Sequence, residues 1–126
     1  MRERRKQELD LVAADYGDLE LPPDLDWFVI QRLVLPHGWN MDTSQLLILI
    51  PPGYPTTPPD NFYADPALRL KGGQQPGSTS TAAQQNRQWL QFSYHADEWY
   101  PHADFRRGHN LLSFLFAVRQ RLSEVN

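Results

Sequence analysis

The feature that most constrains this chain is a proline-rich connection inside the stretch LILIPPGYPTTPPDNFY, residues 47–63. Five of the protein's eleven prolines lie within nine of these residues, at positions 51, 52, 55, 58 and 59. An apolar run precedes them and an aromatic pair follows. Because proline has no N–H to donate to a β-ladder, a strand that arrives from residue 50 must stop here. The fixed φ angles then hold the chain's exit in one direction. The stretch therefore predicts two strands joined by a rigid turn.

Further strands are expected before and after this turn. Residues 27–35 and 44–50 are β-rich, and the segment PHGWNMDT between them has turn chemistry, which predicts a hairpin. The second run is apolar on both faces, as expected of a central strand. Residues 61–64 are expected to supply a third short strand.

Two helices are expected to flank the strands. Within residues 2–16, apolar side chains follow helical spacing at Leu9, Val12, Ala13 and Tyr16. Gly17 suits a left-handed cap at the end of this helix. A second helix is expected from Asn110, a good N-cap residue, to Leu122. Its apolar side is wide enough to pack on a sheet.

Residues 71–88, KGGQQPGSTSTAAQQNRQ, contain almost nothing apolar. Such a segment cannot bury enough surface to offset its ordering entropy, so we expect a mobile flap. The order of elements is then helix, strands, rigid turn, flap and helix. This order predicts an α+β fold with an antiparallel sheet of about four strands, in a single domain that spans residues 1–126.

Composition excludes several function classes. The formal net charge of −3 gives no support to nucleic-acid binding. No apolar run approaches the roughly 20 residues of a membrane span, and the first residues lack the apolar core of a signal peptide. We therefore expect a cytoplasmic protein that binds neither nucleic acid nor membranes and needs no cofactor. Cysteine is absent, which excludes disulfides, thiolate metal sites and a thiol nucleophile.

Two motifs carry a resemblance to the ubiquitin-conjugating enzyme (UBC) superfamily. The turn GYPTTPP is similar to the Tyr-Pro-x-x-Pro-Pro turn after the third strand of the UBC fold, and its motif positions are Tyr54, Pro55, Pro58 and Pro59. Downstream, Trp99 and Pro101 resemble the family's Trp-x-Pro element, and the helix expected at 110–122 follows in the same order. Either motif alone would be weak evidence for the fold, whereas the two motifs together, in the same order as in the family, favour a UBC-like fold.

More narrowly, the chain resembles the bacterial UBC-like proteins, on GWN at 38–40, the stretch 49–63 and FSYHADEW at 92–99. The resemblance implies a carrier that works with an adenylating (activating) enzyme, a ubiquitin-like modifier and a deconjugating peptidase. Such gene sets are associated with defence against phage.

The chain departs from the family at the reaction centre. The family's His-Pro-Asn motif has no counterpart, and the polar flap occupies its place. The catalytic cysteine, expected about eight residues before the tryptophan of Trp-x-Pro, would fall near Gln91 and is missing. A conventional thioester mechanism is therefore excluded for this sequence.

A serine hydroxyl is the remaining candidate nucleophile. If residues 92–99 run as a strand, side-chain alternation places Ser93, His95 and Asp97 on one face. Histidine can take the proton of a hydroxyl, and a carboxylate can orient the histidine. We hypothesise that Ser93 accepts the modifier's C-terminus as an oxyester, with His95 as base and Asp97 as its orienter. The alternative is an ordinary polar segment, because same-face neighbours on a strand are about 7 Å apart.

A basic cluster precedes the apolar stripe of the first helix: Arg2, Arg4, Arg5 and Lys6. The helix dipole disfavours positive charge in these first turns. The cluster is either a solvated helix start or a docking patch for an acidic partner.

Three histidines are spaced by seven residues, at His95, His102 and His109. Pro101 and Gly108 interrupt any helix through them, and no cysteine or His-Glu-x-x-His element supports a metal site. We therefore expect polar loop histidines and no bound metal.

Two functions fit these observations. The first is a noncanonical transferase that receives an activated modifier and passes it on. The second is a binding module, either a pseudo-enzyme of the same fold or an RWD-type domain, that positions a modifier or an activating enzyme. RWD domains share the Tyr-Pro turn and lack both cysteine and His-Pro-Asn, whereas the Trp99 and Pro101 element favours the UBC side.

Overall fold

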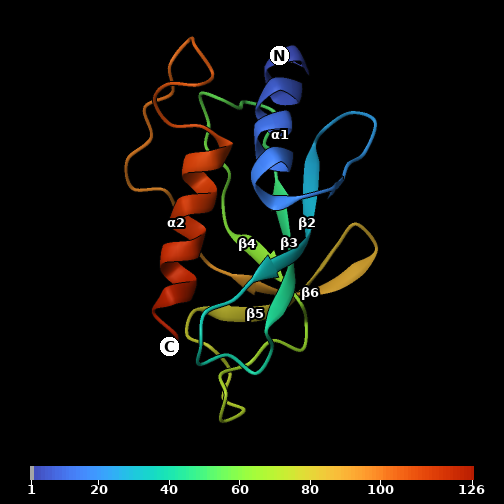
Figure 1. Cartoon of the computed structure of the whole chain (residues 1–126), viewed down its shortest axis with the longest axis vertical. Coiled ribbons are helices and arrows are strands. Elements are labelled where there is room, and N and C mark those ends of the chain that lie inside the picture. Colours follow the sequence, from blue (N-terminus) through green and yellow to red (C-terminus); the bar gives the residue numbers. More distant parts are fainter. Residues whose placement is uncertain (1) are drawn as a thin grey trace.

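A computed structural model describes residues 2–126 and contains two helices packed on a single antiparallel sheet (Figure 1). In chain order the elements are α1 (Arg2–Tyr16), β1 (Leu19–Glu20), β2 (Trp27–Val34), β3 (Thr43–Leu49), β4 (Phe62–Ala64), β5 (Thr79–Gln84), β6 (Arg87–Phe92) and α2 (Leu111–Ser123). The α+β class, the UBC-like order and the expected helices are confirmed. Among residues 2–126, neither helix is long and apolar enough to cross a membrane.

The sheet has six strands in the order β1-β2-β3-β4-β6-β5, and every pair is antiparallel. The expectation of about four strands is therefore wrong. The strands missed from the sequence are β1, which has only two residues, and those of the β5–β6 hairpin. Figure 1 shows this hairpin lying nearly crosswise to β2 and β3, so the sheet is strongly twisted.

The hairpin lies within the segment 71–88, where the sequence predicted a mobile flap. β5 and the start of β6 fall there, so residues 79–84 and 87–88 have regular structure that the sequence did not indicate, and the mobility of the segment stays a prediction. The turn between the strands consists of Gln85 and Asn86, which have φ angles of 53° and 62°. Positive φ at both residues is what a two-residue hairpin turn needs to match strand twist. β6 supplies the apolar side chains of the hairpin, so polar β5 needs none of its own.

The end of α1 and the start of α2 have local causes in the sequence. Gly17 has φ 88° and donates its N–H to the Ala13 carbonyl at 2.9 Å, which ends α1 with the expected left-handed cap. Asn110 caps α2 in a reciprocal capping box. Its Oδ1 accepts from the Ser113 N–H at 2.9 Å, and its own N–H donates to Ser113 Oγ at 2.8 Å.

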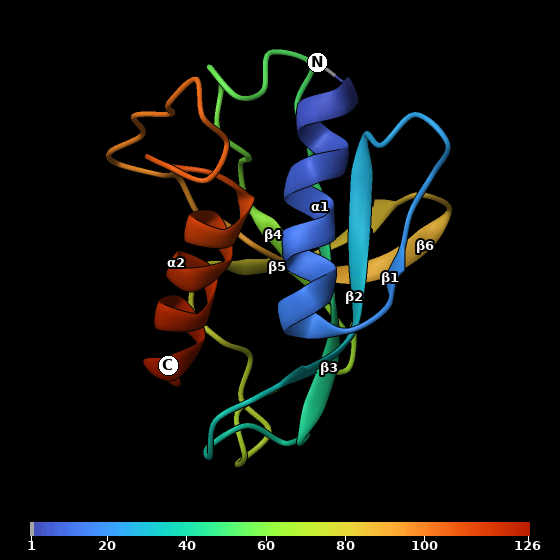
Figure 2. The same ribbon diagram turned by 45° about the horizontal axis from the view of Figure 1, so that its top comes forward.

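The main core lies between the sheet and both helices. Alternate strand residues such as Phe28 and Ile30 face it, together with Leu9 and Val12 of α1 and Val118 of α2. The helices therefore cover the same face, and Figure 2 shows them side by side over the sheet.

A smaller cluster fills the opposite face of the sheet, and consists of the buried residues Val29, Leu47, Tyr63 and Trp89. An ion pair closes over it. The Arg87 guanidinium lies 5.0 Å from the Trp89 ring and 3.2 Å from the Glu20 carboxylate of β1. The twist therefore brings β6 close to β1, although three strands lie between them in the sheet order.

Candidate functional site

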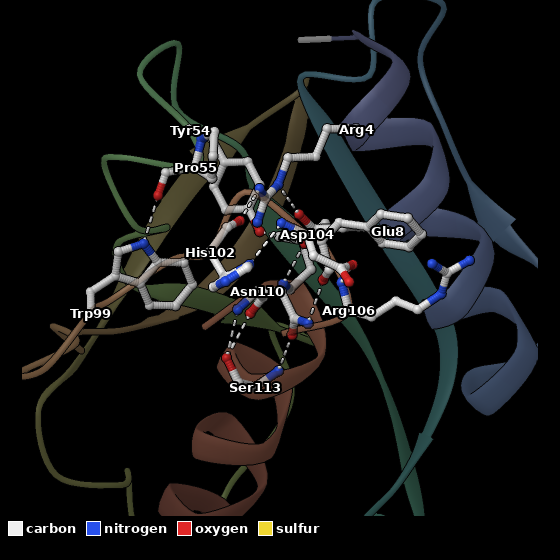
Figure 3. Close-up of polar contacts among 12 residues, drawn as sticks. Arg4, Glu8, Tyr54, Pro55, Trp99, His102, Asp104, Arg106, Asn110 and Ser113 are labelled. Atoms are coloured by element: carbon white, nitrogen blue, oxygen red, sulfur yellow. Dashed lines mark hydrogen bonds and ion pairs between the residues drawn. The ribbon is translucent and has the colours of Figure 1, made fainter. Parts of the chain in front are cut away.

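The two motif segments contact each other directly. The indole Nε1–H of Trp99 donates to the Pro55 carbonyl at 2.7 Å, as Figure 3 shows, and its ring lies 6.2 Å from that of Tyr54. The peptide bond between Tyr54 and Pro55 is cis. The Trp-x-Pro element is therefore fastened to the proline turn, and the chain between β6 and Trp99 forms an irregular segment beside it.

A buried carboxylate holds three elements together behind this contact. Glu8 of α1 is 1% exposed, and its Oε1 accepts from the Tyr54 hydroxyl at 2.5 Å and from the Leu111 N–H at 2.7 Å. Its Oε2 lies 2.7 Å from Arg4 Nε (Figure 3). Leu111 opens α2, so the carboxylate also faces the positive end of that helix dipole. We call Arg4, Glu8, Tyr54 and Leu111 the Glu8 hub.

The hub changes the chemistry of its tyrosine. Burial raises the pKa of the Tyr54 hydroxyl far above its usual value, and the hydrogen bond and negative charge of Glu8 raise that pKa further. Tyr54 therefore stays protonated and acts as a hydrogen-bond donor to Glu8.

Half of the basic cluster expected at the helix start is buried. Arg4 and Arg5 are each 8% exposed. Arg4 Nη1 donates to the His102 carbonyl at 2.6 Å, and Arg5 donates to the carbonyls of Leu25 and Pro51 at 3.0 Å. The reading of these two arginines as solvated residues is therefore wrong, whereas a docking role for them stays a prediction.

The other half of the cluster is exposed. Arg2 donates to the Pro23 carbonyl, and Lys6 lies 3.6 Å from Asp10 one helical turn later. A docking role for Arg2 and Lys6 stays a prediction.

The three residues expected to form a catalytic row do not lie on a strand. β6 ends at Phe92, so the alternation assumed for Ser93, His95 and Asp97 does not apply. Ser93 follows the strand directly, and its N–H extends the hairpin ladder by donating to the Ser78 carbonyl at 2.9 Å. All three side chains are exposed, and no hydrogen bond joins any two of them among residues 2–126.

His95 pairs with a carboxylate that the sequence reading did not consider. Its Nδ1 lies 2.5 Å from Oδ1 of Asp60, the residue directly after the proline run. The next residues fix this arrangement through the backbone. Asn61 donates its N–H to the Tyr94 carbonyl at 2.7 Å, and its Oδ1 accepts from the Tyr94 N–H at 3.0 Å.

A surface groove runs between this segment and α2. Its walls include Asp97, Trp99, Phe114 and Phe116, with Tyr94 at one side. Burial raises the pKa of Tyr94, and the nearby negative charge of Asp97 adds to the rise. The groove therefore offers aromatic and acidic surface, to which Tyr94 and Asp97 of the segment after β6 contribute.

Comparison with known protein families decides the affiliation. The family model described as prokaryotic E2 family E matches residues 9–124. The chain belongs to that family. This E2-like protein therefore has the family relationship that the proline turn and Trp-x-Pro element indicated, although it contains no cysteine. Membership supports an E2-like role in a bacterial ubiquitination-like pathway. No curated protein and no solved structure matches the chain significantly.

Sequence reasoning missed Glu8 and Asp60. A signal for Glu8 was present, because positions 4, 8 and 12 share one face of a helix and only Val12 is apolar. A charged pair that continues an apolar stripe indicates a buried ion pair. Asp60 had no comparable signal, since its partner lies 35 residues further along the chain.

Proposed function

We propose that this E2-like protein receives an activated ubiquitin-like modifier from an adenylating enzyme and transfers it to an acceptor. The observation that carries the proposal is the contact of Trp99 with Pro55, which joins the family's two motifs around the exposed segment 93–98. A deconjugating peptidase as a further partner, a cytoplasmic location and a role in antiphage defence belong to the same proposal, and they rest on the resemblance of the sequence to bacterial UBC-like proteins.

The proposed carrier step is formation of a serine oxyester. Oγ of Ser93 attacks the carbonyl carbon of the modifier's C-terminal acyl adenylate. The new C–O bond forms as the bond to the phosphate oxygen breaks, AMP leaves, and the hydroxyl proton passes to His95. An acceptor amine or hydroxyl then attacks the ester carbonyl, and the Ser93 oxygen leaves and regains a proton. An oxyester is less electrophilic toward amines than a thioester, so transfer to an amine is expected to be slow.

The test mixes this protein with the adenylating enzyme and modifier encoded beside it, together with ATP, and measures intact mass. We expect an adduct that survives reductant, is released by hydroxylamine or base, and is absent from Ser93→Ala. Ser80→Ala, at an exposed serine of β5, is the matched control and should keep the adduct. An adduct of unchanged yield in Ser93→Ala would contradict the assignment of the nucleophile.

The second candidate is a catalytically inactive binding module that positions a modifier or an activating enzyme. It is favoured by Gln91, which stands near the position expected for the cysteine and lies within β6, in register with Tyr63 and Ser80. Tight binding to either partner without any adduct would select this function. A second, cysteine-bearing homologue encoded beside this protein would favour it as well, whereas an adenylating enzyme without another conjugating protein would favour the transferase.

A further inference from the structure

The pair between Asp60 and His95 is held from both sides. Asp60 follows Pro58 and Pro59, whose fixed φ angles limit the freedom of the turn. On the other side, both backbone hydrogen bonds of Tyr94 go to Asn61. The residue after the carboxylate is therefore clamped to the residue before the imidazole. This clamp keeps Asp60 Oδ1 and His95 Nδ1 opposite each other at 2.5 Å.

The pairing determines which ring nitrogen of His95 carries the proton. An ionised carboxylate only accepts hydrogen bonds, so Nδ1 must be the donor. In the neutral imidazole the lone pair then lies on Nε2, which is the nitrogen able to accept a proton. The His95 side chain is 75% exposed, and its ring makes no other hydrogen bond within residues 2–126. Nε2 is thus free to act on a group that approaches from solvent.

We propose that Asp60, in place of Asp97, is the positioning residue that holds His95 with Nε2 ready to take the Ser93 proton. The catalytic part of this inference rests on the proposed function, whereas the orientation of the imidazole does not. Asp60 of the proline turn faces the imidazole, whereas Asp97, the carboxylate expected from the sequence, lies two residues further along the chain than His95. Of the carboxylates in residues 2–126, Asp60 alone lies within hydrogen-bond distance of the ring.

The expected effect on rate is modest because the pair is open to water. Side-chain exposure is 75% for His95 and 61% for Asp60. Exposed pairs contribute little, so removal of Asp60 should slow oxyester formation by about 1.5- to 5-fold. A buried orienting carboxylate would contribute far more.

The orientation is tested by long-range ¹H–¹⁵N spectra of the labelled full chain, at a pH where imidazole is neutral. We expect wild-type His95 to carry its proton on Nδ1. Asp60→Ala should move the proton largely to Nε2, and Asp60→Asn should keep it on Nδ1, because the amide oxygen still accepts. Asp97→Ala and the remote control Asp15→Ala should leave the ring unchanged. A purely structural role for Asp60 would not move the tautomer.

The catalytic part is tested by the rate of adduct formation in the same variants. Asp60→Ala should slow the reaction, with Asp60→Asn in between, and should slow it more than Asp97→Ala does, whereas the remote control Asp15→Ala should retain the wild-type rate. An unchanged tautomer in Asp60→Ala overturns the pairing. A moved tautomer with an unchanged rate overturns the positioning role. Loss of rate in Asp97→Ala alone returns that role to Asp97. Absence of any wild-type adduct overturns the proposed function, while the spectra still decide the pairing.

Discussion

The molecule contains two carboxylate-centred polar clusters with opposite surroundings. In the Glu8 hub the carboxylate is 1% exposed and joins α1, the proline turn and α2. At the other cluster, Asp60 and His95 are 61% and 75% exposed and join two irregular segments. Burial makes each lost partner of the hub costly, whereas water can replace either partner of the exposed pair. The comparison separates a buried cluster that joins three elements from an exposed pair whose imidazole is open to solvent.

The largest expected effect comes from breaking the hub. Glu8→Ala leaves the Nε–H of Arg4, the Tyr54 hydroxyl and the Leu111 N–H without their acceptor. Removing one partner of a buried ion pair costs about 3–5 kcal/mol, and we expect a loss of this size in the free energy of unfolding. Chemical denaturation measures it.

Two matched variants sharpen this prediction. Glu8→Gln keeps an acceptor oxygen and should lose less than Glu8→Ala. Asp10→Ala removes an exposed carboxylate of the same helix, 3.6 Å from Lys6, and should change the free energy of unfolding by less than about 0.5 kcal/mol. Equal losses for Glu8→Ala and Asp10→Ala would contradict the special position of Glu8.

A smaller effect is expected at the hub's tyrosine, and it depends on pH. Tyr54→Phe keeps the ring and removes a hydrogen bond to a charged group, which costs about 1.5–3 kcal/mol near neutral pH. The pKa of Tyr54 is raised in the folded protein. Above pH ~10 the unfolded chain therefore releases a proton that the folded protein keeps. The contribution of the Tyr54 hydroxyl to the free energy of unfolding is therefore fully present below pH ~10 and is lost progressively as the pH rises above that value.

The measurement is the free energy of unfolding as a function of pH in wild type and Tyr54→Phe. Wild-type stability should fall above pH ~10, with about 1.4 kcal/mol per pH unit due to Tyr54. The free energy of unfolding of Tyr54→Phe should fall less steeply with pH, because this variant lacks the one proton that Tyr54 contributes. Tyr100→Phe, at a side chain that is 69% exposed, is the control for loss of a hydroxyl. Identical slopes in wild type and Tyr54→Phe would show that the hydroxyl is not shielded.

The smallest expected effect is on the stability of the exposed cluster. Ser93→Ala and His95→Ala should each change the free energy of unfolding by less than about 0.5 kcal/mol, since neither side chain is buried. The same variants are expected to abolish or slow adduct formation. A large loss of stability in either one would remove the contrast between the two clusters, because the segment would then be structural as well.

Most helices and strands could be predicted from local sequence patterns. The strands that were not predicted lack such a pattern. α2 was predictable because Asn110 starts a clear apolar stripe, and β3 because the apolar run of residues 46–50 ends at prolines. β5 was not, since its Thr, Ser, Ala and Gln side chains give no hydrophobic signal. It is stabilised by pairing with β6, which brings Trp89 and Leu90 opposite Ala82 and Thr81. A strand at the edge of a sheet needs only one good neighbour.

The candidate site was predictable in its residue types and not in its pairings. Exposed Ser93 and His95 follow from the polar sequence after an aromatic strand end. Side-chain alternation selected Asp97 because it assumed that the strand continues through residue 97. The ladder stops one residue after Phe92, so the alternation rule does not apply there. The observed partner Asp60 depends on where the proline turn meets the end of β6. That meeting is a tertiary contact with no local pattern.

The connectivity of the Glu8 hub also has a consequence for the order of folding. Glu8 bonds to residues 46 and 103 positions away in the chain, so its partners are far apart until the domain is nearly complete. Contacts of such separation form late, because closing the intervening loops costs entropy first. During synthesis α1 emerges from the ribosome before α2. The Glu8 carboxylate of α1 therefore stays hydrated until α2 has been synthesised and the Leu111 N–H can replace water as its partner.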